Sequence, residues 1–142
     1  MHQNPPDSEL RRILGEACSI AVVGASSSPD RPSHGIFQRL LAAGYRVYPV
    51  NPNEQTVLGQ RAYAALADLP EPVDIVDVFR RPEHTPAIAA QAVRAGAKVL
   101  WLQSGIHNEA AAEAAEAGGL TVVMDECIGV KHSLLGVPKR RP

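Results

Sequence analysis

The chain has 142 residues, of which 45% are hydrophobic and 20% are charged, and its formal net charge is −1. This length suffices for a core without metals or disulfides, and we expect one domain over residues 1–142 with its core at about 17–136. The near-neutral charge excludes a broad basic surface for nucleic acid, and no apolar run is long enough to cross a bilayer.

The ends of the chain and its cysteines restrict the class further. The N-terminal residues lack the charged and apolar regions of a secretion signal, so we expect a cytoplasmic protein. Cys18 and Cys127 are far apart and lack metal-ligand spacing, which argues against a zinc site or a disulfide scaffold. The only basic cluster, Lys139–Arg141, is better interpreted as a solvated tail. We therefore expect neither a nucleic-acid partner nor a membrane partner.

Five apolar, β-branched runs alternate along the chain with polar segments of helical period. We predict strands at Ile20–Val23, Val47–Val50, Val73–Phe79, Lys98–Leu102 and Leu120–Met124. Continuous apolar runs are typical of parallel strands that helices cover on both faces. The alternation predicts an α/β fold, a Rossmann-like, doubly wound domain with a five-stranded parallel sheet and helices on both faces.

Helix signals lie between these strands. We expect helices at about Ser8–Glu16, from an N-cap at Ser33 to Gly44, at about 63–69, from Pro82 to Gly96, and from an N-cap at Asn108 to Gly118. Right-handed crossovers would most simply arrange the strands in the order 3-2-1-4-5. The switch point would then lie between the first and fourth strands, and a ligand would bind at the carboxyl ends of the strands there.

Polar residues follow the predicted strands. The first strand leads into Gly24, Ala25 and Ser26, the second into Asn51 and Pro52, the third into Phe79, Arg80 and Arg81, and the fourth into Gln103, Ser104 and Gly105. Rigid strand ends of this kind suit a small-molecule site.

The loop after the first strand indicates the chemistry of the ligand. Gly24 permits close backbone approach, and the amide groups at the start of the next helix, with Arg31, Ser33 and nearby hydroxyls, suit an anion. We therefore predict a phosphate-bearing ligand, although ordinary turn residues are the alternative interpretation. Gly24→Val is expected to abolish binding while leaving the fold largely intact.

A dinucleotide cofactor fits this loop less well. The G-x-G-x-x-G pattern fails, because Gly24 is followed by Ala25-Ser26-Ser27-Ser28-Pro29. NAD also favours an acidic residue after the second strand, where this chain has Asn51. NADP is conceivable through Arg80 or Arg81, which serve either to bind phosphate or to solvate a helix start.

The remaining candidates are binding residues rather than catalytic ones. Asn51 suits a ribose or adenine edge and Pro52 suits packing on the base, unless the two form a simple turn. His34 is a candidate ligand contact. Cys127 has no apparent histidine partner, and Asp125 fits a cap of the last helix better than a general base. We predict no catalytic residue and no metal ligand.

Three long segments resemble a known family. "VVGASSSPDRPSHGIFQRLLAAGYRVYPVNP", "LGQRAYAALADLPEPVDIVDVFRRPE" and "GAKVLWLQSGIHNEAAAEAAEAGGLTVVMDECI" resemble the small, single-domain CoA-binding proteins of prokaryotes. That family is similar to the CoA-binding domain of the succinyl-CoA synthetase α-subunit. The match covers about Ile20–Leu135. The synthetase's second domain, which supplies its phosphorylated histidine, does not fit within this length, so ligase activity is not implied.

The resemblance implies where coenzyme A (CoA) would lie. Its phosphates would be near Gly24, Ala25, Ser26 and Arg31–Ser33, its adenosine near Asn51, Pro52, Val78, Phe79 and Arg80, and its pantetheine arm along Gln103 and Gly105. Many relatives have arginine where this chain has Glu126, which implies weaker binding of CoA phosphate here.

These observations predict a module that binds CoA or a short acyl-CoA as a non-catalytic carrier, sensor or regulatory subunit. Two alternatives stay open: an NAD(P)-dependent oxidoreductase or redox sensor, and a protein-interaction domain without a ligand. A homodimer is expected only because symmetric pairs are the commonest oligomers. The sequence identifies no protein partner.

Overall fold

Strands and helices alternate along the chain, as the apolar runs predict. In the computed structural model, which describes residues 1–140, the elements are α1 (Asp7–Glu16), β1 (Ser19–Val23), α2 (Pro32–Ala42), β2 (Arg46–Val50), β3 (Thr56–Val57), β4 (Gln60–Arg61), η1 (Leu66–Asp68), β5 (Ile75–Val78), η2 (Pro82–His84), α3 (Thr85–Arg94), β6 (Val99–Leu102), α4 (Glu109–Ala117), β7 (Thr121–Val123) and α5 (Ile128–Leu134). Arg141, the last residue of the basic cluster, lies outside the described residues.

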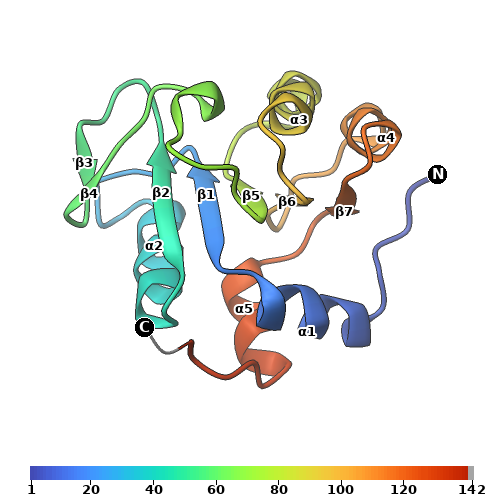
Figure 1. Ribbon diagram of the computed structural model, residues 1–142, viewed down its shortest axis with the longest axis horizontal. Helices are drawn as coiled ribbons and strands as arrows, with labels where there is room; N and C mark the ends of the chain where they lie inside the picture. The colour runs from blue at the N-terminus through green and yellow to red at the C-terminus, as the bar shows by residue number, and fades with distance from the viewer. Residues whose placement is uncertain (141–142) are drawn as a thin grey trace.

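All five predicted strands are present as β1, β2, β5, β6 and β7, and they form one parallel sheet. Figure 1 shows α3 and α4 on one side of this sheet and α1 and α5 on the other. The α/β prediction is therefore confirmed. A small antiparallel hairpin, β3–β4, was not expected and lies between β2 and β5 in the chain.

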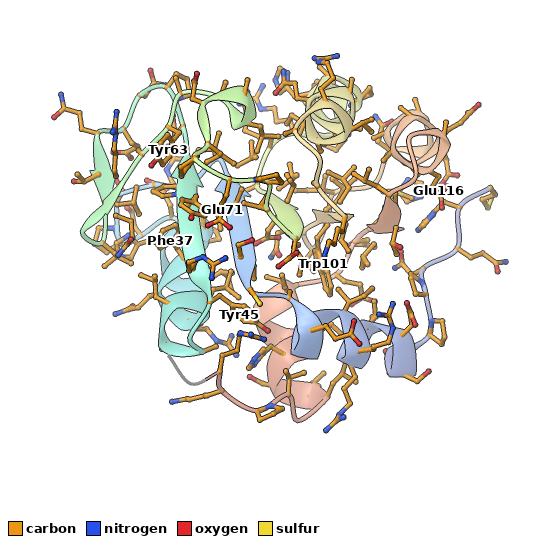
Figure 2. All side chains as sticks on the ribbon, in the orientation of Figure 1. Phe37, Tyr45, Tyr63, Glu71, Trp101 and Glu116 are labelled. Atoms are coloured by element: carbon orange, nitrogen blue, oxygen red, sulfur yellow. The ribbon has the colours of Figure 1, made fainter. Side chains whose placement is uncertain are left out.

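The predicted strand order is wrong. The sheet runs β2-β1-β5-β6-β7, which is the order 2-1-3-4-5, and the switch point lies between the first and third strands. Pro49 in β2 supplies the physical reason. Its carbonyl faces the outer edge of β2 and accepts a hydrogen bond from Tyr63 N (2.9 Å), while its nitrogen, on the same edge, has no hydrogen to donate. Tyr63 lies beside the end of β2 in Figure 2. β2 is thus an edge strand.

The observed order brings together two strand ends that the predicted order would separate. β1 and β5 are direct neighbours, and Phe79 N, just after β5, donates to Val23 O at the end of β1 (2.9 Å). In the order 3-2-1-4-5, β2 would lie between them. The loop after β1 therefore lies beside Phe79 and the arginines that follow it.

Alternating strand residues build two cores, one on each face of the sheet. Ile20 and Val22 of β1 pack with residues of α1, α2 and α5, whereas Ala21 and Val23 pack with residues of α3 and α4. This division follows from the two-residue period of a strand. Each core buries the apolar side chains that its helices turn toward the sheet, which stabilises the strand ends that carry the candidate site.

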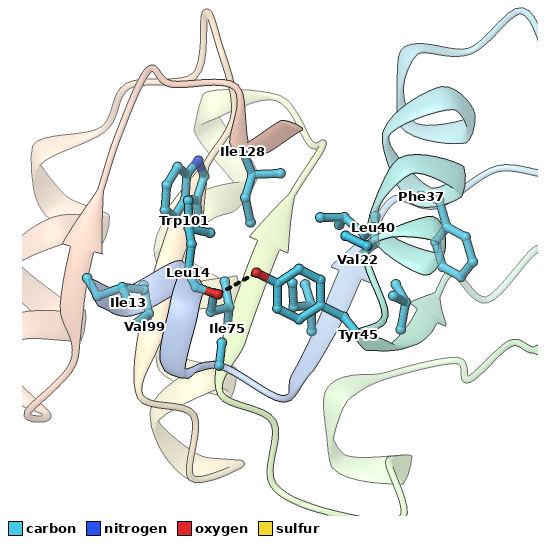
Figure 3. Close-up of a cluster of buried hydrophobic side chains, with 14 of the residues drawn as sticks. Ile13, Leu14, Val22, Phe37, Leu40, Tyr45, Ile75, Val99, Trp101 and Ile128 are labelled. Carbon is cyan, nitrogen blue, oxygen red and sulfur yellow. Dashed lines mark hydrogen bonds between the residues drawn. The ribbon is translucent and has the colours of Figure 1, made fainter. Parts of the chain in front are cut away.

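Tyr45, just after α2, joins the core formed by α1, α2 and α5 to the end of α1. Its ring is buried among Leu40 and Ile75, and its hydroxyl donates to Leu14 O in α1, as the dashed line in Figure 3 shows. Burial raises the pKa of Tyr45 to about 12, so the hydroxyl stays a donor over the physiological range. This bond fixes the end of α1 against the turn after α2.

The helix caps agree in part with the sequence. Asn108 is the N-cap of α4, because its side chain accepts from Ala111 N (2.9 Å), as predicted. Ser33 is not an N-cap, since Arg31 occupies that position and Pro32 begins α2. Proline is well suited to the first helical position, where its missing N–H costs no hydrogen bond. Among residues 1–140, no helix combines the length and apolar character needed to span a membrane.

Candidate functional site

A cleft of about 950 Å³ opens at the carboxyl ends of the strands. Its walls come from the segments that follow β1, β2, β5, β6 and β7, together with the first turn of α2. The residues that line it are Gly24, Ser26, Ser28, Arg31, Pro32, Ser33, Ile36, Val50, Asn51, Pro52, Asn53, Glu54, Phe79, Arg80, Arg81, Gln103, Ser104, Ile106 and Cys127. The cleft is at the place where doubly wound folds bind their ligands.

The backbone at the base of this cleft requires glycine at position 24, whether or not a ligand is bound. Its φ of +88° is a conformation that side-chain-bearing residues rarely adopt, and a Cβ here would overlap the carbonyl oxygen of Phe79. Gly24 N also donates to Val50 O (2.9 Å), which links the ends of β1 and β2. The sequence suggested that Gly24 lets a ligand approach the backbone closely. In the structure, it is the backbone after β5 and the end of β2 that approach Gly24.

The loop after Gly24 is held by side chains from two neighbouring elements. Asn51 Nδ2 donates to Ala25 O (2.9 Å), and Asn51 Oδ1 accepts from Asn53 N (2.9 Å). On the other side of the loop, His34 Nδ1 donates to Ser26 O (3.0 Å). The Asn51 and His34 side chains, which the sequence suggested as ligand contacts, thus both bond to the protein.

Glu54 also bonds to this loop and was not singled out from the sequence. Its carboxylate accepts from Ser27 N and from Ser27 Oγ, both at 2.8 Å. These bonds, the backbone one first, hold the pKa of Glu54 below its ordinary value, so the side chain is ionised at neutral pH. A polar segment such as Asn53-Glu54-Gln55 gives no sign in the sequence of which side chain reaches across to the loop.

Three arginines supply the positive charge of the cleft. Arg31, Arg80 and Arg81 all line it, and all three are exposed. Within residues 1–140, none of their guanidinium groups forms an ion pair or a hydrogen bond with another protein group. Unpaired guanidinium groups at a concave site are suited to phosphate or carboxylate ligands.

The strand ends on the far side of the cleft are also fixed. Gln103 is almost fully buried, and its Oε1 accepts from Ile128 N (3.1 Å) at the start of α5. Asp125 Oδ1 accepts from Gly105 N (2.6 Å), so Asp125 holds the turn after β6 instead of capping α5 as expected. Cys127 is the N-cap of α5, and its free thiol lines the cleft.

A buried acid lies close to these strand ends along the chain. Asp77, in the central strand β5 two residues before Phe79, is fully buried, and neither of its carboxyl oxygens has a hydrogen-bond partner. Burial raises the pKa of Asp77 well above its ordinary value, so the group favours the protonated form. In the sequence, Asp77 is a single acid within an apolar run, a pattern that does not distinguish a buried side chain from an exposed one.

Most of the residues predicted from the sequence meet in the cleft. Those that line it are Gly24, Ser26, Arg31, Ser33, Asn51, Pro52, Phe79, Arg80 and Gln103. Ala25 and Val78 are fully buried beneath it, and His34 and Gly105 lie outside its lining. Further lining residues such as Ser28, Ile36 and Ile106 come from the same segments but carry no signal that separates them from ordinary loop or helix residues. In the part of the chain that the structure describes, no three His, Cys, Asp or Glu side chains cluster as metal ligands would.

Comparison with known proteins finds a matching family and several similar chains. The profile of a protein family described as "CoA binding domain" matches residues 18–133. The chain is 42% identical over 132 residues to the uncharacterized protein YneT of Bacillus subtilis (strain 168), which covers 93% of this chain and 98% of that protein.

Larger enzymes contain a similar segment. The chain is 31% identical over 94 residues to acetate–CoA ligase [ADP-forming] II of Archaeoglobus fulgidus, which covers 64% of this chain but only 14% of the ligase. Among solved structures, a hypothetical protein from Pyrococcus horikoshii OT3 superimposes with a TM-score of 0.89 at 37% identity, covering 95% of this chain and 99% of that one.

Proposed function

Because this chain belongs to the family of CoA-binding domains, we propose that it binds coenzyme A or a short acyl-CoA in the cleft at the carboxyl ends of its sheet. CoA carries a diphosphate and a 3′-phosphate, and its pantetheine arm is long and weakly polar. A ligand of this kind needs several cationic contacts at one end and a narrow, less charged path at the other.

The single observation that carries the proposal is the set of three unpaired arginines in the cleft. Arg31 comes from the loop after β1, whereas Arg80 and Arg81 follow β5, so the cationic groups approach from two adjacent strand ends. Among the described residues of the cleft lining no other is cationic, and the one carboxylate there, Glu54, is bonded to Ser27 and not to an arginine. The arginines are thus available to phosphate groups.

The far side of the cleft suits the uncharged arm of CoA. The residues that line it there are Gln103, Ser104, Ile106 and Cys127, and none of them is an acidic or basic residue. The adenosine end would then lie over the segment after β2, where Pro52 is exposed. Since both side-chain atoms of Asn51 bond to the protein, we assign Asn51 to holding the loop and not to reading the adenine edge.

A non-catalytic role is part of the proposal. Cys127 carries the only thiol in the described cleft lining, and it has no hydrogen bond to a base among the described residues. The Gln103 side chain is occupied by its hydrogen bond to Ile128 N at the start of α5. A nucleophile without an activating base is a poor catalyst. We therefore favour a carrier, sensor or regulatory module over an enzyme.

Calorimetric titration tests the proposal. The purified protein, freed of any co-purified ligand, would be titrated with CoA, acetyl-CoA, NAD and NADP. Micromolar or tighter binding of the CoA compounds alone, about −8 kcal/mol or better, is the expected result. Binding of NAD or NADP instead would support an oxidoreductase, and binding of none of the four would favour an interaction domain.

A further inference from the structure

The carboxylate of Glu54 forms two hydrogen bonds to Ser27 in the loop that follows β1, and we call this pair of bonds the Glu54 clasp. It accepts from both donors of Ser27, the backbone N and the hydroxyl Oγ, each at 2.8 Å. The two residues are 27 positions apart in the chain, so the contact joins the segment after β2 to the loop after β1. Glu54 is also the only acidic residue that lines the cleft.

The clasp is one of three contacts that hold consecutive residues of the loop. Ala25 O accepts from Asn51, Ser26 O accepts from His34, and Ser27 donates to Glu54. Two of these partners come from the segment after β2 and one comes from α2. Of the three, the Glu54 clasp is the outermost, because Ala25 is buried and Ser27 is exposed. It is therefore the one of the three that joins an exposed residue of the loop to the segment after β2.

The charge of Glu54 makes its effect on a ligand easy to test. A negative charge in a cleft for a phosphate-bearing ligand repels that ligand, so electrostatics alone predicts tighter binding when the charge is removed. The clasp predicts the opposite for a variant that also loses the two hydrogen bonds. A loop that is not held must be ordered when the ligand binds, and this ordering lowers affinity.

We propose that Glu54 is a positioning residue for the ligand, and that its hydrogen bonds to Ser27 hold the loop after β1 in the conformation that binds phosphate. This inference rests on the proposed function, because the ligand is taken to be CoA. It assigns to Glu54 a role that its charge alone would contradict.

Two substitutions at position 54 separate geometry from charge. In Glu54→Gln the amide oxygen still accepts from Ser27 N, and the amide nitrogen donates to the Ser27 hydroxyl, so the clasp persists without the charge. Glu54→Ala removes both. Glu83→Gln is a matched control, since Glu83 is exposed in η2, lies outside the cleft lining and follows Arg81 closely in the chain.

Titration with CoA gives the first measurement. We expect Glu54→Ala to bind CoA about tenfold more weakly than the wild type, equivalent to about 1.4 kcal/mol. Glu54→Gln is expected to bind as tightly as the wild type or more tightly, and Glu83→Gln is expected to show no loss. If Glu54→Ala binds CoA as tightly as the wild type, or if Glu54→Gln loses as much affinity as Glu54→Ala, the clasp does not position the ligand.

Amide hydrogen exchange without ligand gives the second measurement and separates this inference from the proposed function. The Ser27 amide should exchange faster in Glu54→Ala than in the wild type and in Glu54→Gln. Unchanged exchange in Glu54→Ala would overturn the inference whatever the affinities are. A wild-type protein that binds no CoA would overturn the proposed function, while the exchange rates would still decide whether the clasp orders the loop.

Discussion

Gly24 and the carbonyl oxygen of Phe79 are so close that no side chain fits between them. A Cβ on Gly24 would overlap that oxygen and would also lie 3.3 Å from Arg80 Cδ. The contact exists because β1 and β5 are neighbours in the sheet. The loop after β1 and the arginines after β5 therefore form one site, and the residue at their junction must be glycine.

Substitution of Gly24 is expected to damage the fold as well as the site, which corrects the sequence-based expectation for Gly24→Val. Gly24→Ala should lower the free energy of unfolding by at least about 2 kcal/mol, because it combines a positive φ with a backbone overlap. Urea denaturation measures the change. Gly35→Ala is the matched control: Gly35 lies in α2 with open space around it, so the same substitution should be neutral or stabilising. Equal stabilities of Gly24→Ala and the wild type would refute the contact.

Arg31→Ala should weaken CoA binding by removing one of the three cationic groups that line the cleft. Screening makes this loss depend on salt, because the Debye length falls from about 10 Å at 0.1 M to about 3 Å at 1 M ionic strength. We expect a loss of about tenfold at low salt and a smaller one at high salt, measured by calorimetry. Arg94→Ala removes the same charge from the exposed end of α3, outside the cleft lining, and should change affinity little. A loss at Arg31 that does not vary with salt would indicate packing instead of charge.

The strands could be read from the sequence, but their order could not be read from helix and strand periods alone. Short apolar runs such as Val99–Leu102 predict a buried strand, since both faces of a central parallel strand are apolar. The order depends on which edge of β2 can accept a further strand. Pro49 indicates that edge, because its nitrogen cannot donate a hydrogen bond to a further strand. This inference requires knowing which edge of β2 Pro49 faces.

The cleft could be located from the sequence more reliably than the roles of its residues could be assigned. Strand ends identify Arg31, Arg80 and Gln103, because a parallel sheet brings all carboxyl ends to one edge. The position of Asn51 after β2 suggests a ligand contact, yet its amide holds the loop. Nothing in the sequence near Glu54 indicates its role, because a side chain that bonds across 27 residues has no local signature.

Asn4 is expected to stabilise the edge of the sheet beyond β7. Its Nδ2 donates to Met124 O and its Oδ1 accepts from Met124 N, both at 2.8 Å, so the side chain pairs with the backbone as a neighbouring strand would. Asn4→Ala should lower the free energy of unfolding by about 1–2 kcal/mol, because two hydrogen bonds are lost. Gln3→Ala, at an exposed position beside it, serves as the control in urea denaturation. If the two variants are equally stable, the pairing contributes nothing.

Asp77 is expected to make the stability of the protein fall as the pH rises. Burial raises the pKa of this carboxyl in the folded state above the ordinary value of about 3.9 that applies when the chain is unfolded. Above that value the unfolded chain releases the proton, whereas the folded protein keeps it, so the free energy of unfolding decreases until the pH passes the folded-state pKa. The decrease from this one group approaches about 1.4 kcal/mol per pH unit.

Asp77→Asn removes this titration while keeping the shape of the side chain. The variant should therefore gain stability relative to the wild type as the pH is raised, and urea denaturation at pH 4.5, 6 and 7.5 (about the range over which the unfolded carboxyl is ionised) measures the difference. Asp30→Asn is the control, because Asp30 is exposed in the loop before α2 and its removal should leave the pH dependence unchanged. A constant difference between Asp77→Asn and the wild type across these pH values would show that Asp77 titrates alike in the folded and unfolded states, which its complete burial without a hydrogen-bond partner argues against.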